Sequence, residues 1–119
     1  MLTSLLGTLA TSTDFGTILS HTMTAGTVIA SFDDAATFAS AVVINSANLA
    51  NVIGYLVANT ATLDAIAFLY DSDNNGVNDG TMVYSNQATD SLVFLAGVTG
   101  ADTLIIGTNA AGANDLHIS

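Results

Sequence analysis

Residues 46–58 carry apolar side chains at the spacing of one helix face. Their positions follow i, i+3, i+4, i+7 and i+8, which predicts an amphipathic helix with one apolar stripe. The stripe consists of Leu49, Val52, Ile53, Leu56 and Val57. Ser46 is a suitable N-cap, and Asn59 is a suitable residue for the C-terminal end. The sequence therefore predicts a core-packing helix at about 46–58.

Most other apolar residues fall in short segments that are typical of strands. The predicted strands are residues 2–10, 17–23, 27–32, 64–70, 80–85, 91–98 and 102–107. Segment 91–98 is apolar almost throughout, which predicts a strand buried on both faces. The Ala-rich segment 35–41, which follows Asp34, predicts a turn or a short helix. The whole pattern predicts a mainly β (α+β) fold, a β-sandwich or sheet-like domain with one packed amphipathic helix.

Length and composition favour a single domain over residues 1–119. Half of the 119 residues are hydrophobic, which is enough for one modest core. There is no Cys, so neither disulfides nor thiol chemistry are expected. Residues 35–63 are uncharged and long enough to cross a bilayer, but Asn, Ser and Thr are scattered through them and no Lys or Arg flanks them. We therefore expect no membrane span.

The charge of the chain is entirely negative. It has no Lys, no Arg and no Glu, and its ten Asp residues give a formal net charge of −10. Without cationic side chains it cannot neutralise phosphates, which excludes nucleic acid and disfavours anionic membranes as partners. Only 8% of its residues are charged, and a weakly charged surface resists self-association poorly. We therefore expect a homo-oligomer or polymer.

Residues 71–79 place oxygen-bearing side chains at the spacing of a calcium-binding loop. The expected ligands are the side chains of Asp71, Asp73 and Asn75, the carbonyl of Val77 and, directly or through water, the side chain of Asp79. Gly76, at loop position 6, would allow the sharp turn. A cation is the natural charge partner of these carboxylates, because the chain offers no Lys or Arg. The predicted cofactor is Ca²⁺.

Two features of this loop leave alternatives open. Asp, Asn and Gly also favour plain solvated turns between strands. In addition, Met82 stands at loop position 12, where an EF-hand has a bidentate Glu, so a complete EF-hand is not expected. The missing ligand would come from Asp64, Asp90 or a neighbouring chain, or the site would be weak.

No catalytic constellation is evident. His21 and His117 are far apart, and without Cys or Glu they make a poor zinc set. Neither a G-x-S-x-G nucleophile motif nor a phosphate-binding loop with Lys occurs. Asp33 and Asp34 adjoin, but neighbouring residues of a strand point to opposite faces. The Tyr and Phe side chains are expected in the core. We therefore expect no enzymatic activity.

Residues 67–80 and 90–98 resemble the C-terminal region of bacterial RTX and S-layer-type proteins that are exported by type I secretion. In that region an Asp/Asn/Gly turn follows a strand, and a later strand ends in Leu-x-Gly-Val, here at residues 95–98. Residues 27–34 are similar to the strand that precedes this turn, and residues 115–119 to the ending of the family. The likeness covers residues 27–119, which leaves 1–26 as a possible arm or extension. The nonapeptide repeats of the family are absent.

The resemblance implies an uncleaved C-terminal export signal, type I secretion machinery as a partner, and calcium-triggered folding outside the cell. The leading hypothesis is a secreted, non-enzymatic, calcium-dependent structural protein that self-assembles into a fibre, surface layer or biofilm matrix. One alternative is a C-terminal secretion or anchoring module of a larger surface protein. Another is a calcium-dependent adhesin that binds a cell-surface glycan through its aromatic residues.

Overall fold

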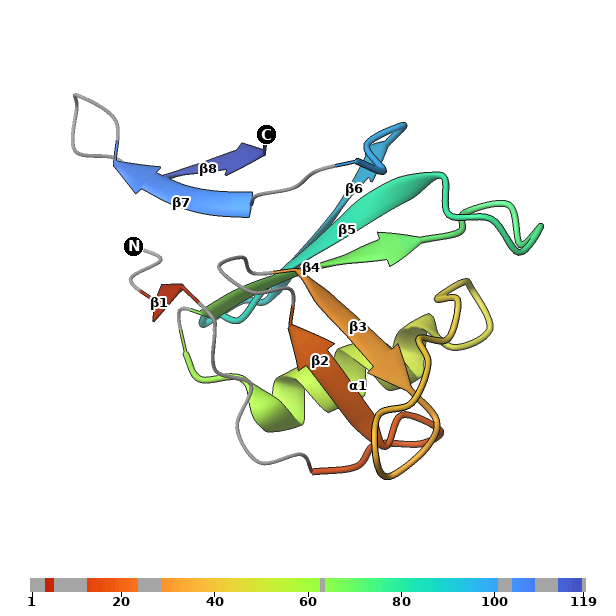
Figure 1. Ribbon diagram of the computed structural model, residues 1–119. Helices are drawn as coiled ribbons and strands as arrows, with labels where there is room; N and C mark the ends of the chain where they lie inside the picture. The colour runs from red at the N-terminus through yellow and green to blue at the C-terminus, as the bar shows by residue number, and fades with distance from the viewer. Residues whose placement is uncertain are drawn as a thin grey trace.

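The computed structural model of the chain describes residues 4–5, 13–23, 29–62, 64–100, 104–108 and 114–118. It confirms a mainly β fold with one helix among these residues (Figure 1). The described segments form eight strands and one helix, in the order β1-β2-β3-α1-β4-β5-β6-β7-β8. Two of the predicted strands, 64–70 and 80–85, match the observed bounds of β4 and β5.

The largest sheet has four strands in the order β1-β4-β5-β6. The strands are β1 (Ser4–Leu5), β4 (Asp64–Tyr70), β5 (Gly80–Ser85) and β6 (Ser91–Ala96). β4, β5 and β6 form an antiparallel meander, and β1 pairs in parallel with the start of β4. The register places Phe68 opposite Met82 and Met82 opposite Phe94. These apolar side chains therefore share one face of the sheet.

Two further pairs of strands form separate hairpins. β2 (Ser20–Met23) pairs with β3 (Ala30–Asp33), and β7 (Leu104–Thr108) pairs with β8 (Asn114–Ile118). In Figure 1 the β7–β8 hairpin lies at the upper left of the molecule, and the helix lies below the four-stranded sheet. β2 pairs with β3, Ile18 is buried and Met23 packs against the core, so this N-terminal segment contributes to the core. Most of the predicted strand at 2–10 lies outside the described residues.

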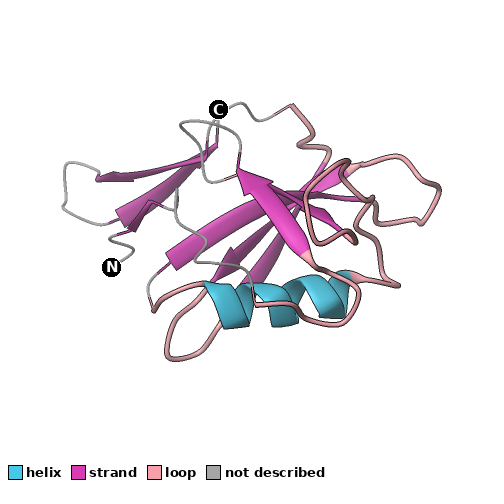
Figure 2. Cartoon of the chain, turned by 60° about the horizontal axis from the view of Figure 1, so that its bottom comes forward, coloured by secondary structure: helices cyan, strands magenta, loops and turns pink. Residues whose placement is uncertain are grey.

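The helix α1 spans Leu49–Asn59, later than predicted at its start. Asn48 rather than Ser46 is its N-cap, and the Asn48 side chain makes no capping bond to the helix. The buried face also differs, because Tyr55 is fully buried whereas Val57 is 51% exposed. The helix is rotated so that Tyr55 faces the hairpin and the sheet. Figure 2 shows α1 lying along one side of the strands.

Aromatic side chains join the three layers of the core. The ring of Phe32 on β3 makes edge-to-face contacts with Tyr55 on α1 and Phe68 on β4, with centroids 5.8 and 5.7 Å apart. On the same face of the sheet, Tyr70 and Phe94 contact each other at 5.5 Å. Such pairs add to the burial of apolar area. The expectation that the tyrosines lie in the core is confirmed, because Tyr55, Tyr70 and Tyr84 are all buried.

The prediction that the strand at 91–98 is buried on both faces is wrong. β6 is the outermost strand of its sheet, and Leu92 and Val93 are 41% and 51% exposed. Only Phe94 and Leu95 pack against the core. An apolar run shows that a segment is compatible with burial, but the neighbouring strands decide whether it is covered.

Residues 35–41 form bends and no helix. The carboxylate of Asp33 accepts hydrogen bonds from the backbone N–H groups of Ala39 (2.7 Å) and Ser40 (3.1 Å), which folds the segment back on itself. Asp34, which directly precedes this segment, is exposed. Among the described residues no helix has the length and apolar character needed to span a bilayer.

Candidate metal centre

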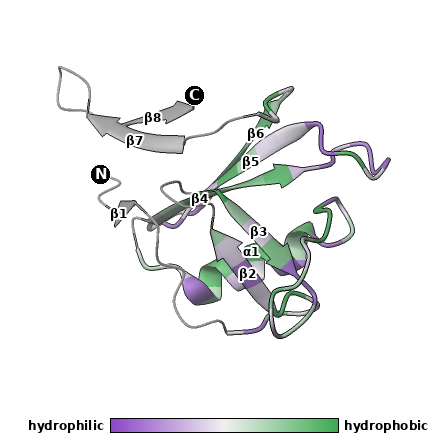
Figure 3. Cartoon of the chain, viewed as in Figure 1, coloured by the Kyte–Doolittle hydropathy of each residue, from purple (hydrophilic) through white to green (hydrophobic). Residues whose placement is uncertain are grey.

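The loop that joins β4 to β5 is the most polar segment near the core, and Figure 3 shows it in purple. The N–H of Asp79 donates to the carbonyl of Tyr70 (3.0 Å), which closes the loop where the two strands begin to pair. The N–H of Asp71 donates to the carbonyl of Ile44 (2.8 Å). The loop is therefore tied both to its own hairpin and to the segment before α1.

Asp71 occupies the inside of the loop and has no exposed surface. Its carboxylate accepts hydrogen bonds from the backbone N–H groups of Gly76 (2.7 Å) and Asn75 (3.2 Å). Burial acts to raise the pKa of Asp71, but these backbone hydrogen bonds outweigh it and lower the pKa. Asp71 is therefore a carboxylate anion at neutral pH.

The middle of the loop turns sharply around Asp73 and Asn75. The carboxylate of Asp73 accepts from the N–H (3.2 Å) and the amide Nδ2 (3.0 Å) of Asn75. Asn74 and Gly76 have φ angles of 61° and 89°, in the left-handed region. Gly76 adopts this conformation at little cost because it has no Cβ, as expected for position 6 of the loop.

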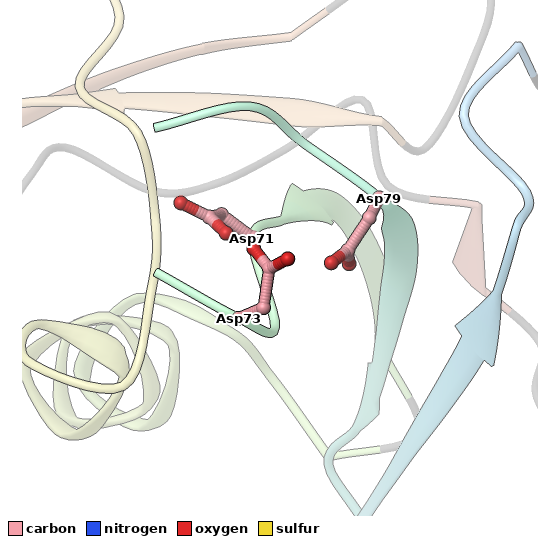
Figure 4. A group of neighbouring side chains, drawn as sticks. All are labelled: Asp71, Asp73 and Asp79. Carbon is pink, nitrogen blue, oxygen red and sulfur yellow. The ribbon is translucent and has the colours of Figure 1, made fainter. Parts of the chain in front are cut away.

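Asp79 brings the third carboxylate to the same place. It accepts from the N–H (3.1 Å) and the hydroxyl (2.7 Å) of Ser72. One ligand atom from each of Asp71, Asp73 and Asp79 lies within 4.8 Å of the others. Figure 4 shows the carboxylates of Asp73 and Asp79 pointing toward each other. This group could hold a metal ion, with Asp71 buried, Asp79 partly buried and Asp73 exposed.

The other predicted ligands divide into two groups. Asn75 and Val77 belong to the same loop, where the N–H of Val77 donates to Oδ1 of Asn75 (2.8 Å). Asp64 is the first residue of β4, whereas Asp71 follows its last residue. At about 3.3 Å per residue, a seven-residue strand puts roughly 20 Å between them. Asp64 therefore cannot complete the site within one chain.

Asp90 also lies at the far end of the sheet, in the turn between β5 and β6. Its carboxylate accepts from the hydroxyl of Tyr84 (3.1 Å) and the N–H of Gln87 (3.0 Å). Burial and the interaction with Asp90 raise the pKa of Tyr84 to about 12. Met82, at loop position 12, is buried in the core on β5. Within one chain, the site is therefore built from the loop alone.

The sequence pattern missed two groups that shape this loop. Ser72 orients the carboxylate of Asp79. Its position between Asp71 and Asp73 is the one feature of the sequence that could have indicated this role. The carbonyl of Ile44 accepts a hydrogen bond from the N–H of Asp71. No local sequence pattern predicts a contact between segments so far apart in the chain. Both contacts position the candidate ligands Asp79 and Asp71 and supply no ligand themselves.

Asn78, within the same loop, has an unpaired buried side-chain oxygen: its Oδ1 has no hydrogen-bond partner among the described residues. Asn78 lines a cavity of about 60 Å³ together with Phe32, Ile44 and Phe68. A buried water needs roughly 10–15 Å³ of such space and two or more polar partners. The cavity has the room, and Asn78 offers one acceptor.

Comparison with known proteins found no protein similar to this chain. Neither protein-family models, nor curated proteins, nor solved structures gave a match to this chain. Its function is therefore argued from its own residues.

Proposed function

We propose that this chain is a non-enzymatic, calcium-dependent extracellular structural protein that associates with copies of itself into a fibre, layer or matrix. The observation that carries the proposal is the convergence of Asp71, Asp73 and Asp79 within 4.8 Å in a chain without Lys or Arg. Carboxylates this close repel one another unless a cation lies between them.

The donor set of the loop fits calcium better than other common metals. Three carboxylates, the side-chain oxygen of Asn75 and the carbonyl of Val77 are all oxygen ligands, without the nitrogen or sulfur that zinc prefers. Calcium accepts six to eight oxygens in irregular geometry, whereas magnesium demands a near-ideal octahedron. A hairpin loop whose irregular oxygen ligands are completed by water suits calcium.

Calcium dependence supports an extracellular location. An ion that binds only the folded state stabilises it by mass action, so this fold gains stability where calcium is abundant. Inside a cell, where calcium is scarce, the carboxylates would repel one another and the chain would stay easier to unfold for export. The resemblance of residues 27–119 to type I-secreted surface proteins supports the same location.

The glycan-binding alternative receives no support from the aromatic residues. A sugar platform needs an exposed ring, but Tyr55, Tyr70 and Tyr84 are buried. Among the described large aromatic side chains, Phe15 alone is substantially exposed, at 47%. A structural role is therefore the better-supported function.

We expect calcium to raise the melting temperature of the chain, and replacement of Asp71→Asn with Asp73→Asn to abolish that gain. At a calcium concentration of 100 times Kd the stabilisation would be about 2.7 kcal/mol. Thermal melts in calcium and in EGTA measure the gain. The matched control is Asp14→Asn with Asp34→Asn, which removes the same charge from two exposed sites and should keep the gain.

Electron microscopy of the purified chain in calcium and in EGTA tests the structural role itself. Fibres, sheets or regular oligomers in calcium would support it. Monodisperse monomers in both conditions would refute assembly, even if the melts show that calcium binds.

A further inference from the structure

The outer edge of β6 is a free strand edge within the described structure. β6 pairs with β5 on one side, and its other side has no neighbour among the described strands. The six pairs with β5 run without a bulge from Ser85↔Ser91 to Gly80↔Ala96. The unpaired N–H and C=O groups of such an edge are a template for another strand.

This edge also lacks the features by which proteins block strand addition. Charged residues, Lys above all, proline, and bulges usually protect an exposed edge. Residues 91–101 contain no charge and no proline, and Leu92 and Val93 project exposed apolar side chains. The edge is therefore both open and apolar.

We propose that two copies of the chain pair through β6, as antiparallel strands about a two-fold axis that places Val93 opposite Val93 of the second copy. In this register Leu92 of each copy faces Phe94 of the other, so apolar residues meet on both faces of the extended sheet. The inference rests on the proposed calcium-dependent assembly and names its first interface.

Charge favours a second copy as the occupant of this edge. Two chains of net charge −10 repel each other, and they approach with least repulsion where neither carries a carboxylate, as along residues 91–101. The antiparallel arrangement also sends the two Asp90 carboxylates, which precede β6, to opposite ends of the pair. A basic peptide would find no acidic residue along the strand to select its Lys or Arg. An uncharged apolar strand fits, and β6 is such a strand.

The loop of residues 71–79 is hydrogen-bonded to the segment that follows β6. The N–H of Gly97, which follows β6, donates to the backbone carbonyl of Asp79 (2.8 Å). The hydroxyl of Thr81 in β5 donates to the carbonyl of Val98 (2.5 Å). An ion bound at Asp79 would therefore restrict the motion of the end of β6. Each bound Ca²⁺ would also neutralise two of the ten negative charges. Both effects make pairing stronger in calcium than in EGTA.

Sedimentation equilibrium of the full chain in calcium and in EGTA measures the pairing, and calorimetric calcium titration of the same samples measures ion binding separately. We expect a dimer in calcium whose dissociation constant rises at least tenfold in EGTA. Val93→Lys should make the protein monomeric while leaving calcium binding unchanged. The matched control is Val57→Lys on α1, where the native side chain has the same 51% exposure; this variant should still form the dimer.

A cysteine cross-link tests the register, because the native chain has no Cys. Oxidised Val93→Cys should give a disulfide-linked dimer in calcium, since directly opposite residues bring their Cβ atoms close to disulfide range. Val57→Cys should remain monomeric on a denaturing gel. Calcium binding without a dimer would overturn this inference and leave the metal site standing. A dimer that survives Val93→Lys would also overturn it, because assembly would then use another surface.

Discussion

The buried carboxylates of Asp33 and Asp71 are stabilised by hydrogen bonds from backbone N–H groups rather than by opposite charges. Asp33 is 2% exposed, and the N–H groups of Ala39 and Ser40 lower its pKa despite its burial. Asp34, the adjacent residue, is exposed. Asp33 and Asp34 thus differ in burial, because only Asp33 faces the segment that folds over it.

His21 is the titrating side chain that can be tested near neutral pH. Its Nδ1 lies 2.6 Å from the hydroxyl of Tyr55, and burial lowers its pKa below 6.5. Below pH 6.5 the unfolded chain takes up a proton that folded His21 resists, so its contribution to stability is full above pH 6.5. That contribution is lost as the pH falls from 6.5 toward the folded pKa.

We therefore predict that the melting temperature of the wild-type chain falls between pH 7 and pH 5 and that His21→Gln reduces this fall. Melts of both proteins across this range, in matched buffers, give the comparison. His117 is present in both proteins, so the difference between them isolates His21. Equal slopes for the two proteins would contradict the assigned role of burial.

At the scale of elements, β5 decides the packing of the sheet. All six of its residues are buried, because β4 and β6 flank it. Gly80 begins β5 against the ring of Phe94, and a Cβ there would also lie 2.7 Å from the carbonyl oxygen of Leu95. The close approach of two strands and an aromatic ring therefore requires glycine at this position.

Replacement of Gly80→Ala should lower the free energy of unfolding by about 1–3 kcal/mol, the usual cost of overpacking a close contact. Chemical denaturation followed by fluorescence or circular dichroism measures the loss. Gly100→Ala is the control, because a Cβ at Gly100 meets no atom within 4 Å. A Gly80→Ala protein as stable as the wild type would show that Phe94 has room to move.

At the scale of the whole molecule, the electrostatic interactions between charged side chains are mainly repulsive. With no Lys or Arg, the Asp residues repel one another and cannot form ion pairs with such side chains. Salt therefore weakens repulsion without breaking Lys or Arg salt bridges.

We predict that in EGTA the melting temperature rises when NaCl is increased from about 10 mM to about 100 mM, as the Debye length falls from about 30 to about 10 Å. The rise should be smaller in calcium, where the densest carboxylate group is already neutralised in part. Equal concentrations of KCl should give the same rise, because screening depends on ionic strength. A melting temperature that falls with salt would count against carboxylate repulsion as the dominant electrostatic force.

The sequence by itself determined the features that depend on local pattern. Alternating apolar residues predicted β4 and β5, helical spacing predicted α1 to within three residues, and ligand spacing predicted a loop in which Asp71, Asp73 and Asp79 converge. These features are local because they depend on periods of two or 3.6 residues and on the geometry of one turn.

Only the tertiary structure decided which surfaces are covered. It placed β6 at an edge although its sequence suits a buried strand, turned Tyr55 rather than Val57 toward the core, and put Asp64 and Asp90 at the far end of the sheet. The physical reason is that burial and ligand sharing depend on neighbours distant in sequence, and strand order cannot be read from one segment.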